Sequence, residues 1–301
     1  MVHGKSIRIY LEEGTNNGLV ISEIVNWTGE VTSFPRSKLK QFIQVGNEKP
    51  GIYFLINKET QEVYIGESDN VAKRLSQHEK DTLKGFWETT CVVTSKDQNL
   101  TKSHIRYLES RLIGLVQDSE LYTSKNGNSG SQTIMNLPKA DISDMEFFLA
   151  QMQIVLPVLG LVFLETGRVS HDELLRKQQT EHGNSGVKIA KFILKQKDIV
   201  AYAQEINGDF IVMKGSKVAS SLSLAAKKHN YIINLRPKLF EKNIIDTQTF
   251  EFVQDYKFNS PSAAAAIVAG RGANGRLMWK LQENEHITYG QWQEEQLPNF
   301  M

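Results

Sequence analysis

The sequence predicts an α+β protein with two domains, and three observations support this prediction. The chain has 301 residues, enough for two domains that each bury a core. Both halves mix strand-like runs with runs of helical period. The stretch RKQQTEHGNSGV, residues 176–187, is polar, carries two glycines and has no period. We therefore expect domains at residues 1–175 and 187–301.

The elements of the first half follow from local patterns. SIRIYLEEG and GLVISEIVNWTGEV, with turn residues between them, indicate strands, and SKLKQFIQV after Pro35 indicates a short amphipathic helix. GIYFLIN and EVYIGES are joined by the polar turn KETQ and predict a hairpin. DNVAKRLSQHEKD begins with an Asx residue and has a helical period. WETTCVVTS is a further strand, and LTKSHIRYLESRLIGLVQDS is a long helix with Thr101 as its N-cap.

An apolar stretch near the middle of the chain raises the question of a membrane span. Phe147–Leu164 is 18 residues long and has no charged residue. Gln151, Gln153, Pro157 and Gly160 interrupt it, so we interpret it as a buried helix followed by a strand. We expect a soluble chain with no membrane partner.

The second half has its own element signals. VAYAQEINGDFIVMKGS predicts two strands around Asn207-Gly208, a typical hairpin turn. SSLSLAAKKHNYIINL indicates a helix. In SPSAAAAIVAG, Ser260 is the expected N-cap, Pro261 the first helical residue and Gly270 the stop. The following GRGANG spells GxGxxG but comes after a helix, which argues against a dinucleotide site.

Composition limits the classes of function. The formal net charge is +1, so any nucleic-acid binding must come from local basic patches. Cys91 is the only cysteine, which excludes an internal disulfide and Cys-based zinc spacing and suits a reducing cytoplasm. The N-terminal residues have no apolar run of the signal-peptide type.

The predicted hairpin carries two tyrosines that we expect to face one another. Tyr53 and Tyr64 lie on paired runs, eleven residues apart. Two facing phenols can share a proton or position a water, whereas the alternative is a cross-strand aromatic packing pair.

The helix after the hairpin adds a basic face. Arg74 and His78 are four residues apart and share one face, with Lys73 beside them. An Arg fork suits a phosphate and a histidine can relay a proton, whereas the alternative is a solvated basic surface.

Glu109 falls inside the apolar stripe of the long helix, four residues after Ile105 and three before Leu112. A carboxylate there needs a partner, either an arginine such as Arg106 or Arg111, or a metal ion. A carboxylate with waters is a common way to hold Mg²⁺ at phosphate sites.

These residues together resemble the GIY-YIG nuclease superfamily: GIY at 51–53, YIG at 64–66, then the Arg, the His and the Glu in that order. PRSKL, YIGESDNVAKRLSQH and SKDQNLTKSHIRYLESRLI are similar to a bacterial subgroup of these nucleases. VMKGS and SPSAAAAIVAGRGANG resemble a C-terminal domain of unknown function that often follows it. The implied fold is a small antiparallel sheet flanked by helices, with the nuclease core at about residues 48–140.

The resemblance implies phosphodiester hydrolysis with one Mg²⁺ or Mn²⁺ held by Glu109. Tyr53 or Tyr64 would take the proton of the attacking water, Arg74 would stabilise charge on the phosphate, and His78 would contact the phosphate or orient the base. Gly51 and Gly66 would let the backbone pass close to the site.

The family also has an asparagine near the phosphate, and three asparagines of this chain compete for that place. They are Asn126, Asn128 and Asn136, of which we favour Asn136 in IMNLP.

A basic surface is expected outside the nuclease domain. Residues 187–240 carry ten Lys/Arg against three acidic residues. Lys188, Lys191 and Lys195 would share a face if that run is helical. This surface is either a grip for nucleic acid or a solubilising face.

We expect a metal-dependent DNA endonuclease of defence or DNA repair, with the C-terminal domain selecting or gripping the substrate. The alternatives are a binding module for nucleic acid or protein that no longer cuts, and, less favoured, an RNA substrate. A homodimer would allow a double-strand cut.

Overall fold

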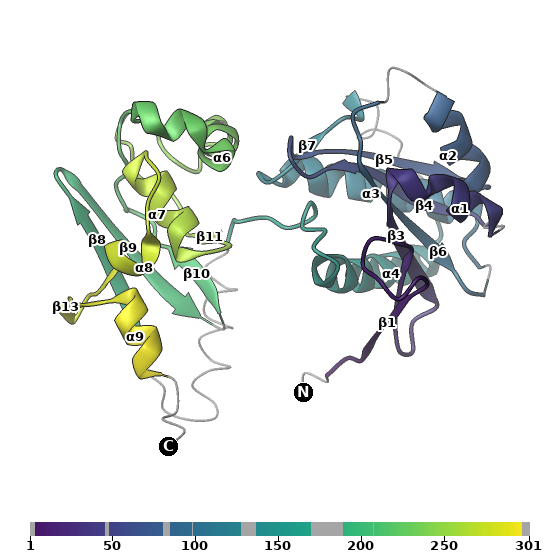
Figure 1. The fold of residues 1–301 in the computed structure, drawn as a ribbon, viewed down its shortest axis with the longest axis horizontal. Coiled ribbons are helices and arrows are strands. Elements are labelled where there is room, and N and C mark those ends of the chain that lie inside the picture. The colour runs from purple at the N-terminus through teal and green to yellow at the C-terminus, as the bar shows by residue number, and fades with distance from the viewer. Residues whose placement is uncertain are drawn as a thin grey trace. The chain divides into compact units, whose positions relative to one another are not determined.

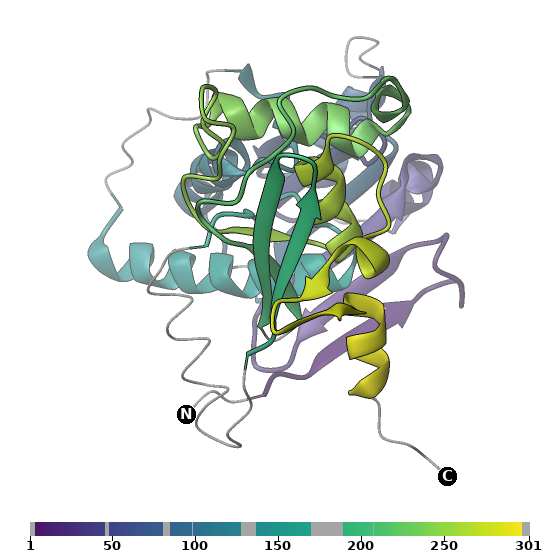
Figure 2. The same ribbon diagram turned by 90° about the vertical axis from the view of Figure 1, so that its left-hand side faces the viewer.

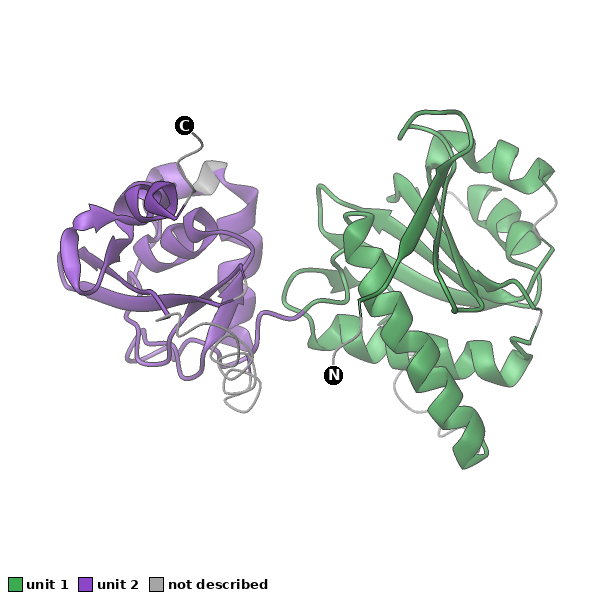
Figure 3. Cartoon of the chain, turned by 90° about the horizontal axis from the view of Figure 1, so that it is seen from below, with its two compact units in different colours: residues 1–165 green, residues 166–301 purple. Residues whose placement is uncertain are grey.

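The computed structural model describes residues 4–45, 48–80, 85–97, 99–127, 137–169, 189–206 and 208–296. These form two compact units, residues 1–165 and 166–301, which are described separately (Figure 3). The predicted linker at 176–187 lies outside the described residues.

The first unit is built on a seven-stranded sheet in the order β1-β2-β3-β6-β4-β5-β7 (Figure 1). Neighbouring strands are antiparallel except β5 and β7, which are parallel. The strands are β1 (Ile7–Leu11), β2 (Val20–Ile24), β3 (Gly29–Pro35), β4 (Gly51–Asn57), β5 (Glu62–Ser68), β6 (Thr89–Ser95) and β7 (Thr123–Ser124).

Helices cover both faces of this sheet because β4 alternates its apolar side chains between two cores. Ile52, Phe54 and Ile56 face a core closed by α3 and α4, while Tyr53 and Leu55 face a second core closed by α1 and α2. The helices are a 3₁₀ turn η1 (Arg36–Lys38), α1 (Leu39–Gln44), α2 (Val71–Lys80), α3 (Lys102–Asp118) and α4 (Lys139–Val158).

The second unit has a six-stranded antiparallel sheet in the order β11-β10-β9-β8-β12-β13, with helices packed on it (Figure 2). The strands are β8 (Lys191–Gln196), β9 (Ile199–Ile206), β10 (Asp209–Val212), β11 (Tyr256–Phe258), β12 (Lys280–Leu281) and β13 (Asn284–Thr288). The helical elements are a 3₁₀ turn η4 (Leu224–Lys228), α6 (Asn230–Glu241), α7 (Pro261–Ala269), α8 (Gly275–Met278) and α9 (Tyr289–Glu295).

The predicted α+β class is confirmed, and several helix ends follow their capping signals. The Thr101 side chain accepts a hydrogen bond from the backbone of His104. The Ser260 side chain caps α7, which ends at Gly270 with a left-handed backbone, φ 64°. β9 and β10 form the expected hairpin, and Gly208 in its turn has φ 82°.

Three expectations were wrong in detail. No strand of the described residues follows α4 directly, and Pro157 lies in its last turn. The single helix expected around 220–235 is split at His229 into η4 and α6. The run with Lys191 and Lys195 is strand β8, because Phe192 and Leu194 are buried against the sheet's helices.

Among the described residues, no helix is both long enough and apolar enough to cross a membrane. In α4 the buried side chains come from one side, while Phe147, Ile154 and Val158 are exposed. This helix therefore packs on the sheet along one face.

Candidate active site

The strand register places the two tyrosines on one face of the sheet. Tyr53 pairs with Gly66, and Leu55 pairs with Tyr64, so the tyrosines are diagonal neighbours. Their ring centroids are 6.3 Å apart. Tyr53 is fully buried, whereas Tyr64 is half-buried.

Helix α2 brings His78 against the tyrosines. The Tyr53 hydroxyl lies 2.8 Å from Nε2 of His78, and both residues are buried. The His78 ring is also 5.7 Å from the Tyr64 ring, edge-on. Burial raises the pKa of the Tyr53 phenol well above its usual range, and the neighbouring Tyr64 phenol adds to this. A hydrogen bond with Nε2 therefore holds a tyrosine that does not ionise readily by itself.

Arg74 lies one turn before His78 and connects both sides of the site. Its guanidinium hydrogen-bonds to Tyr53. This hydrogen bond raises the pKa of Arg74 and lowers the pKa of Tyr53, where it opposes the larger effect of burial. Glu67 also raises the pKa of Arg74 through its charge. Lys73 is exposed beside Arg74, and its backbone N–H is capped by Oδ1 of Asn70 at 2.8 Å.

Gly66 is needed because Tyr53 lies across the backbone of β5. A Cβ at Gly66 would stand 2.2 Å from both Cζ and the hydroxyl oxygen of Tyr53. A Cβ at Gly51 would stand 2.4 Å from the carbonyl oxygen of Val93 on the neighbouring strand. Both glycines thus allow close packing of strands and side chains that carry the site.

Glu109 reaches β5 from α3. It accepts a hydrogen bond from the backbone N–H of Glu67, the residue next to Gly66. Burial, and then the charge of Glu67, raises the pKa of the Glu109 carboxyl, while Arg106 and Arg74 oppose this. Arg111 instead forms a bidentate ion pair with Glu146, in which Nε donates to Oε1 at 2.6 Å and Nη2 donates to Oε2 at 3.0 Å.

Glu67 is a site residue that the sequence reasoning missed. Its Oε1 lies 3.6 Å from Nε of Arg106. The alternation along β5 could have found it, because residues 63, 65 and 67 share the face covered by α3. Within the described part of the chain, no three His, Cys, Asp or Glu side chains gather as a metal site. Glu109, with Glu67 nearby, still fits Mg²⁺, which is commonly held by one or two carboxylates together with waters and phosphate oxygens.

Asn126 is the asparagine that the structure places at this edge. Its Oδ1 accepts from the Ile65 N–H at 2.9 Å, and its Nδ2 donates to the Ile65 carbonyl at 2.6 Å. Asn128 and Asn136 lie outside the described residues.

The basic residues expected to hold nucleic acid belong to the second unit. Lys191 and Lys195 are exposed on β8, and Lys195 pairs with Glu285. Lys188 lies outside the described residues.

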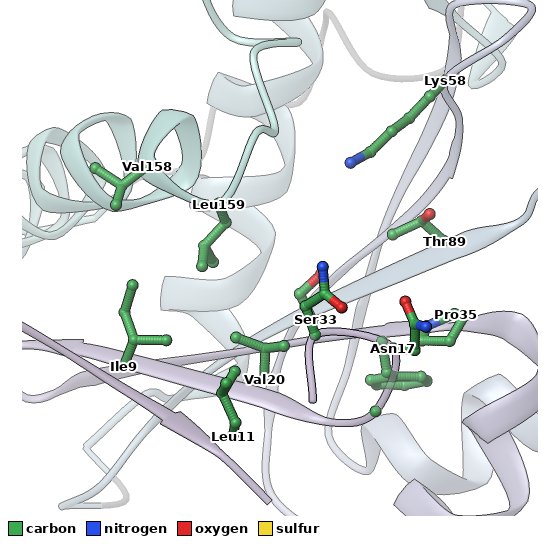
Figure 4. Close-up of a pocket in the computed structure, with 13 residues that line it drawn as sticks. Ile9, Leu11, Asn17, Val20, Ser33, Pro35, Lys58, Thr89, Val158 and Leu159 are labelled. Atoms are coloured by element: carbon green, nitrogen blue, oxygen red, sulfur yellow. The ribbon is translucent and has the colours of Figure 1, made fainter. Parts of the chain in front are cut away.

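A cavity of about 430 Å³ in the first unit is separate from these residues (Figure 4). Apolar side chains of β1, β2 and the end of α4 line it, together with Lys58 and Thr89. Its lining residues include no carboxylate and no histidine.

Comparison with known proteins agrees with the geometry. Residues 49–126 match the family model of the GIY-YIG catalytic domain, and residues 192–293 match a domain of unknown function, DUF4357. No curated protein and no solved structure matches the chain. The chain therefore combines a GIY-YIG domain of the nuclease superfamily with a C-terminal DUF4357 domain.

Proposed function

We propose that this protein is a metal-dependent DNA endonuclease that hydrolyses phosphodiester bonds at the Gly66–Glu67 edge of β5. The observation that carries the proposal is the convergence of side chains from three elements there. Tyr53 of β4 and Arg74 of α2 meet at Gly66, and Glu109 of α3 hydrogen-bonds to the next residue. The proposed cellular role is defence against foreign DNA or DNA repair.

Glu109 would hold Mg²⁺ or Mn²⁺, with Glu67 beside it. When bound, the ion would polarise the scissile phosphate and support the leaving oxygen. Arg74 is placed to stabilise negative charge on the same phosphate, since a guanidinium donates to phosphate oxygens in a fork.

Tyr53 and His78 provide a route for the proton of the attacking water. The raised pKa of Tyr53 makes its anion a costly resting state, so the tyrosine needs a partner that takes its proton. We propose that Tyr53 accepts the water proton while it donates its own proton to Nε2 of His78, 2.8 Å away. Tyr64, which is more exposed, would orient the water.

The second unit would help to hold the DNA. Residues 166–301 contain 18 Lys/Arg and 14 Asp/Glu, a net charge of +4, whereas residues 1–165 contain 17 and 20, a net charge of −3. The exposed Lys191 supports a role in phosphate contact. Acidic partners of Lys195 and Lys217 reduce the field of this surface.

The test is a nicking assay on supercoiled plasmid and a single-stranded circle, in EDTA, Mg²⁺ and Mn²⁺. We expect Glu109→Gln to lower metal-dependent cutting by about 10²–10³-fold or more. Asp118→Asn is the control, because it removes an exposed carboxylate from the same helix.

Two results would contradict the proposal. Wild-type protein that binds DNA but cuts neither circle with any metal would indicate a binding module. Faster cutting of a matched RNA would reassign the substrate.

A further inference from the structure

A second cavity of the first unit, about 290 Å³, joins the nuclease domain to residues outside the matched range. It is lined by the turn between β2 and β3, the helix α4, the end of β6 and the start of α3. Its volume suits one small planar ligand rather than a drug-sized one. The residues that define its chemistry are Asn26, Trp27, Asn99, Asp144, Phe147 and Phe148.

Aromatic side chains form the apolar wall. The rings of Trp27 and Phe148 have centroids 4.9 Å apart. Phe147 also lines the cavity and is 59% exposed. Among the described residues, the indole N–H of Trp27 is buried without a hydrogen-bond partner. An exposed aromatic ring beside a small cavity is the arrangement on which a nucleobase stacks.

Polar groups define the rim and favour a base over a phosphate. Asn26 carries an amide, which suits the donor–acceptor edge of a base, whereas the side-chain N–H of Asn99 already donates to Asp97. The Asp144 carboxylate accepts from exocyclic amino groups and repels phosphate. Asn26 has a left-handed backbone, φ 68°, a conformation that asparagine adopts more readily than most non-glycine residues.

The cavity lies at the same end of the sheet as the candidate active site. Gly51 pairs with Thr94 of β6 on one side and with Ser68 of β5 on the other. Ser95 lines the cavity and Glu67 borders the active site, so two strand spacings, about 10 Å, separate them across the sheet. Along α3, His104 of the cavity precedes Glu109 by five residues, about 7.5 Å. A duplex rises about 3.4 Å per base pair, so the two distances correspond to about three and about two base pairs.

We infer that this cavity receives a single unpaired or extruded base of the DNA that the active site cuts. The inference rests on the proposed nuclease function and adds a device for substrate selection. Enzymes that read a base outside the stack hold it between aromatic side chains and bond its pairing edge. The N-terminal strands and α4 would then select DNA with a mismatched, bulged or damaged base near the cut.

The test measures binding of the full-length protein in EDTA, so that cleavage does not interfere. The probes are a 20-base-pair duplex with one unpaired 2-aminopurine and the same duplex fully paired. We expect tighter binding to the first, with quenched 2-aminopurine fluorescence. Phe147→Ala should lower the ratio of the two affinities by about tenfold, since stacking of a base on an aromatic ring contributes this much.

Two further variants make the result specific. Ile154→Ala removes an exposed apolar side chain of α4 outside the cavity and should keep the preference. Asn26→Gly allows the left-handed backbone, removes the amide and should weaken the preference.

Equal binding of both duplexes, or a preference that survives Phe147→Ala, would overturn the inference while leaving the nuclease intact. Failure to bind either duplex, together with no nicking of plasmid, would overturn the proposed function and this inference together.

Discussion

At the scale of single residues, the candidate site depends on the fit of Tyr53 over Gly66. A methyl group at residue 66 would overlap the Tyr53 ring, whose hydroxyl is also in contact with Nε2 of His78. We expect Gly66→Ala to destabilise the protein by about 1–3 kcal/mol and to lower cleavage by displacing the hydroxyl.

Urea unfolding and nicking rates measure the two effects of Gly66→Ala. Gly114→Ala is the control: it lies on α3 with open space around its Cβ. A helical Gly→Ala change there should stabilise by up to about 1 kcal/mol. Normal cleavage by Gly66→Ala would show that the Tyr53 position does not matter.

Glu109 should make stability depend on pH when no metal is bound. Its pKa is raised in the folded state, mainly by burial, so the folded protein binds the proton more tightly than the unfolded chain. The Glu109 carboxyl therefore contributes most to the free energy of unfolding below its unfolded pKa of about 4.3. This stabilisation is lost as pH rises through the folded pKa.

It follows that Glu109→Gln should be more stable than wild type at pH 7 in EDTA and no more stable at pH 4. Chemical denaturation at the two pH values measures this. Mg²⁺ should stabilise the wild type, because it binds only the folded protein, and should leave the stability of Glu109→Gln unchanged. A variant less stable than wild type at pH 7 would mean that the carboxylate is favourably paired in the fold.

The sequence could predict which side chains carry the chemistry, because the motif residues are spaced on paired strands and on helix faces. Glu67 was missed, although the alternation along β5 places it on the same face as residues 63 and 65, because only the structure shows that α3 covers that face. The resemblance left open whether His78 contacts the phosphate or orients the base, and the Tyr53–His78 contact, between residues 25 positions apart, is seen only in the structure. The role of Asn126 as a backbone clamp also depends on a tertiary contact.

At the scale of elements, Asn126 holds the edge of β5 beyond the point where β7 stops pairing. β7 pairs only with Glu62 and Val63, and Asn126 then bonds both backbone groups of Ile65. Asn126→Ala should cost about 1–2 kcal/mol for the two hydrogen bonds and speed hydrogen exchange at the Ile65 amide.

Asn126→Asp provides a graded comparison. It keeps the acceptor for the Ile65 N–H and loses the donor to the Ile65 carbonyl. Exchange mass spectrometry should place it between wild type and Asn126→Ala. Unchanged exchange in both variants would show that β5 is held without the clamp.

Elements with strong local signals were predictable, and elements decided by burial were not. Thr101, Ser260 and Gly270 fix helix ends through caps that a sequence shows directly. β8 was not predictable as a strand from its lysines, because the neighbouring sheet buries Phe192 and Leu194. The stretch after Val158 has strand-like composition but pairs with no neighbour as a named strand among the described residues.

At the scale of the whole molecule, each unit has a core made only from its own residues. The two cores of the first unit lie between Ile7 and Leu164, and those of the second between Val169 and Trp292. All candidate catalytic residues are in the first unit. We therefore expect residues 1–165 to fold alone and to keep metal-dependent nicking, with weaker DNA binding.

Circular dichroism, thermal unfolding and the nicking assay test residues 1–165, with Glu109→Gln in the same fragment as the control. The full chain should show a steeper fall of DNA affinity with salt, by about 0.9 in the log–log slope for each phosphate that the second unit contacts. Lys191→Gln in the full chain should remove part of that difference, because its side chain is exposed on β8. A fragment that folds cooperatively and binds DNA but does not cut would show that the second unit supplies a group to the chemistry. Equal salt slopes for fragment and full chain would instead remove the second unit from phosphate contact.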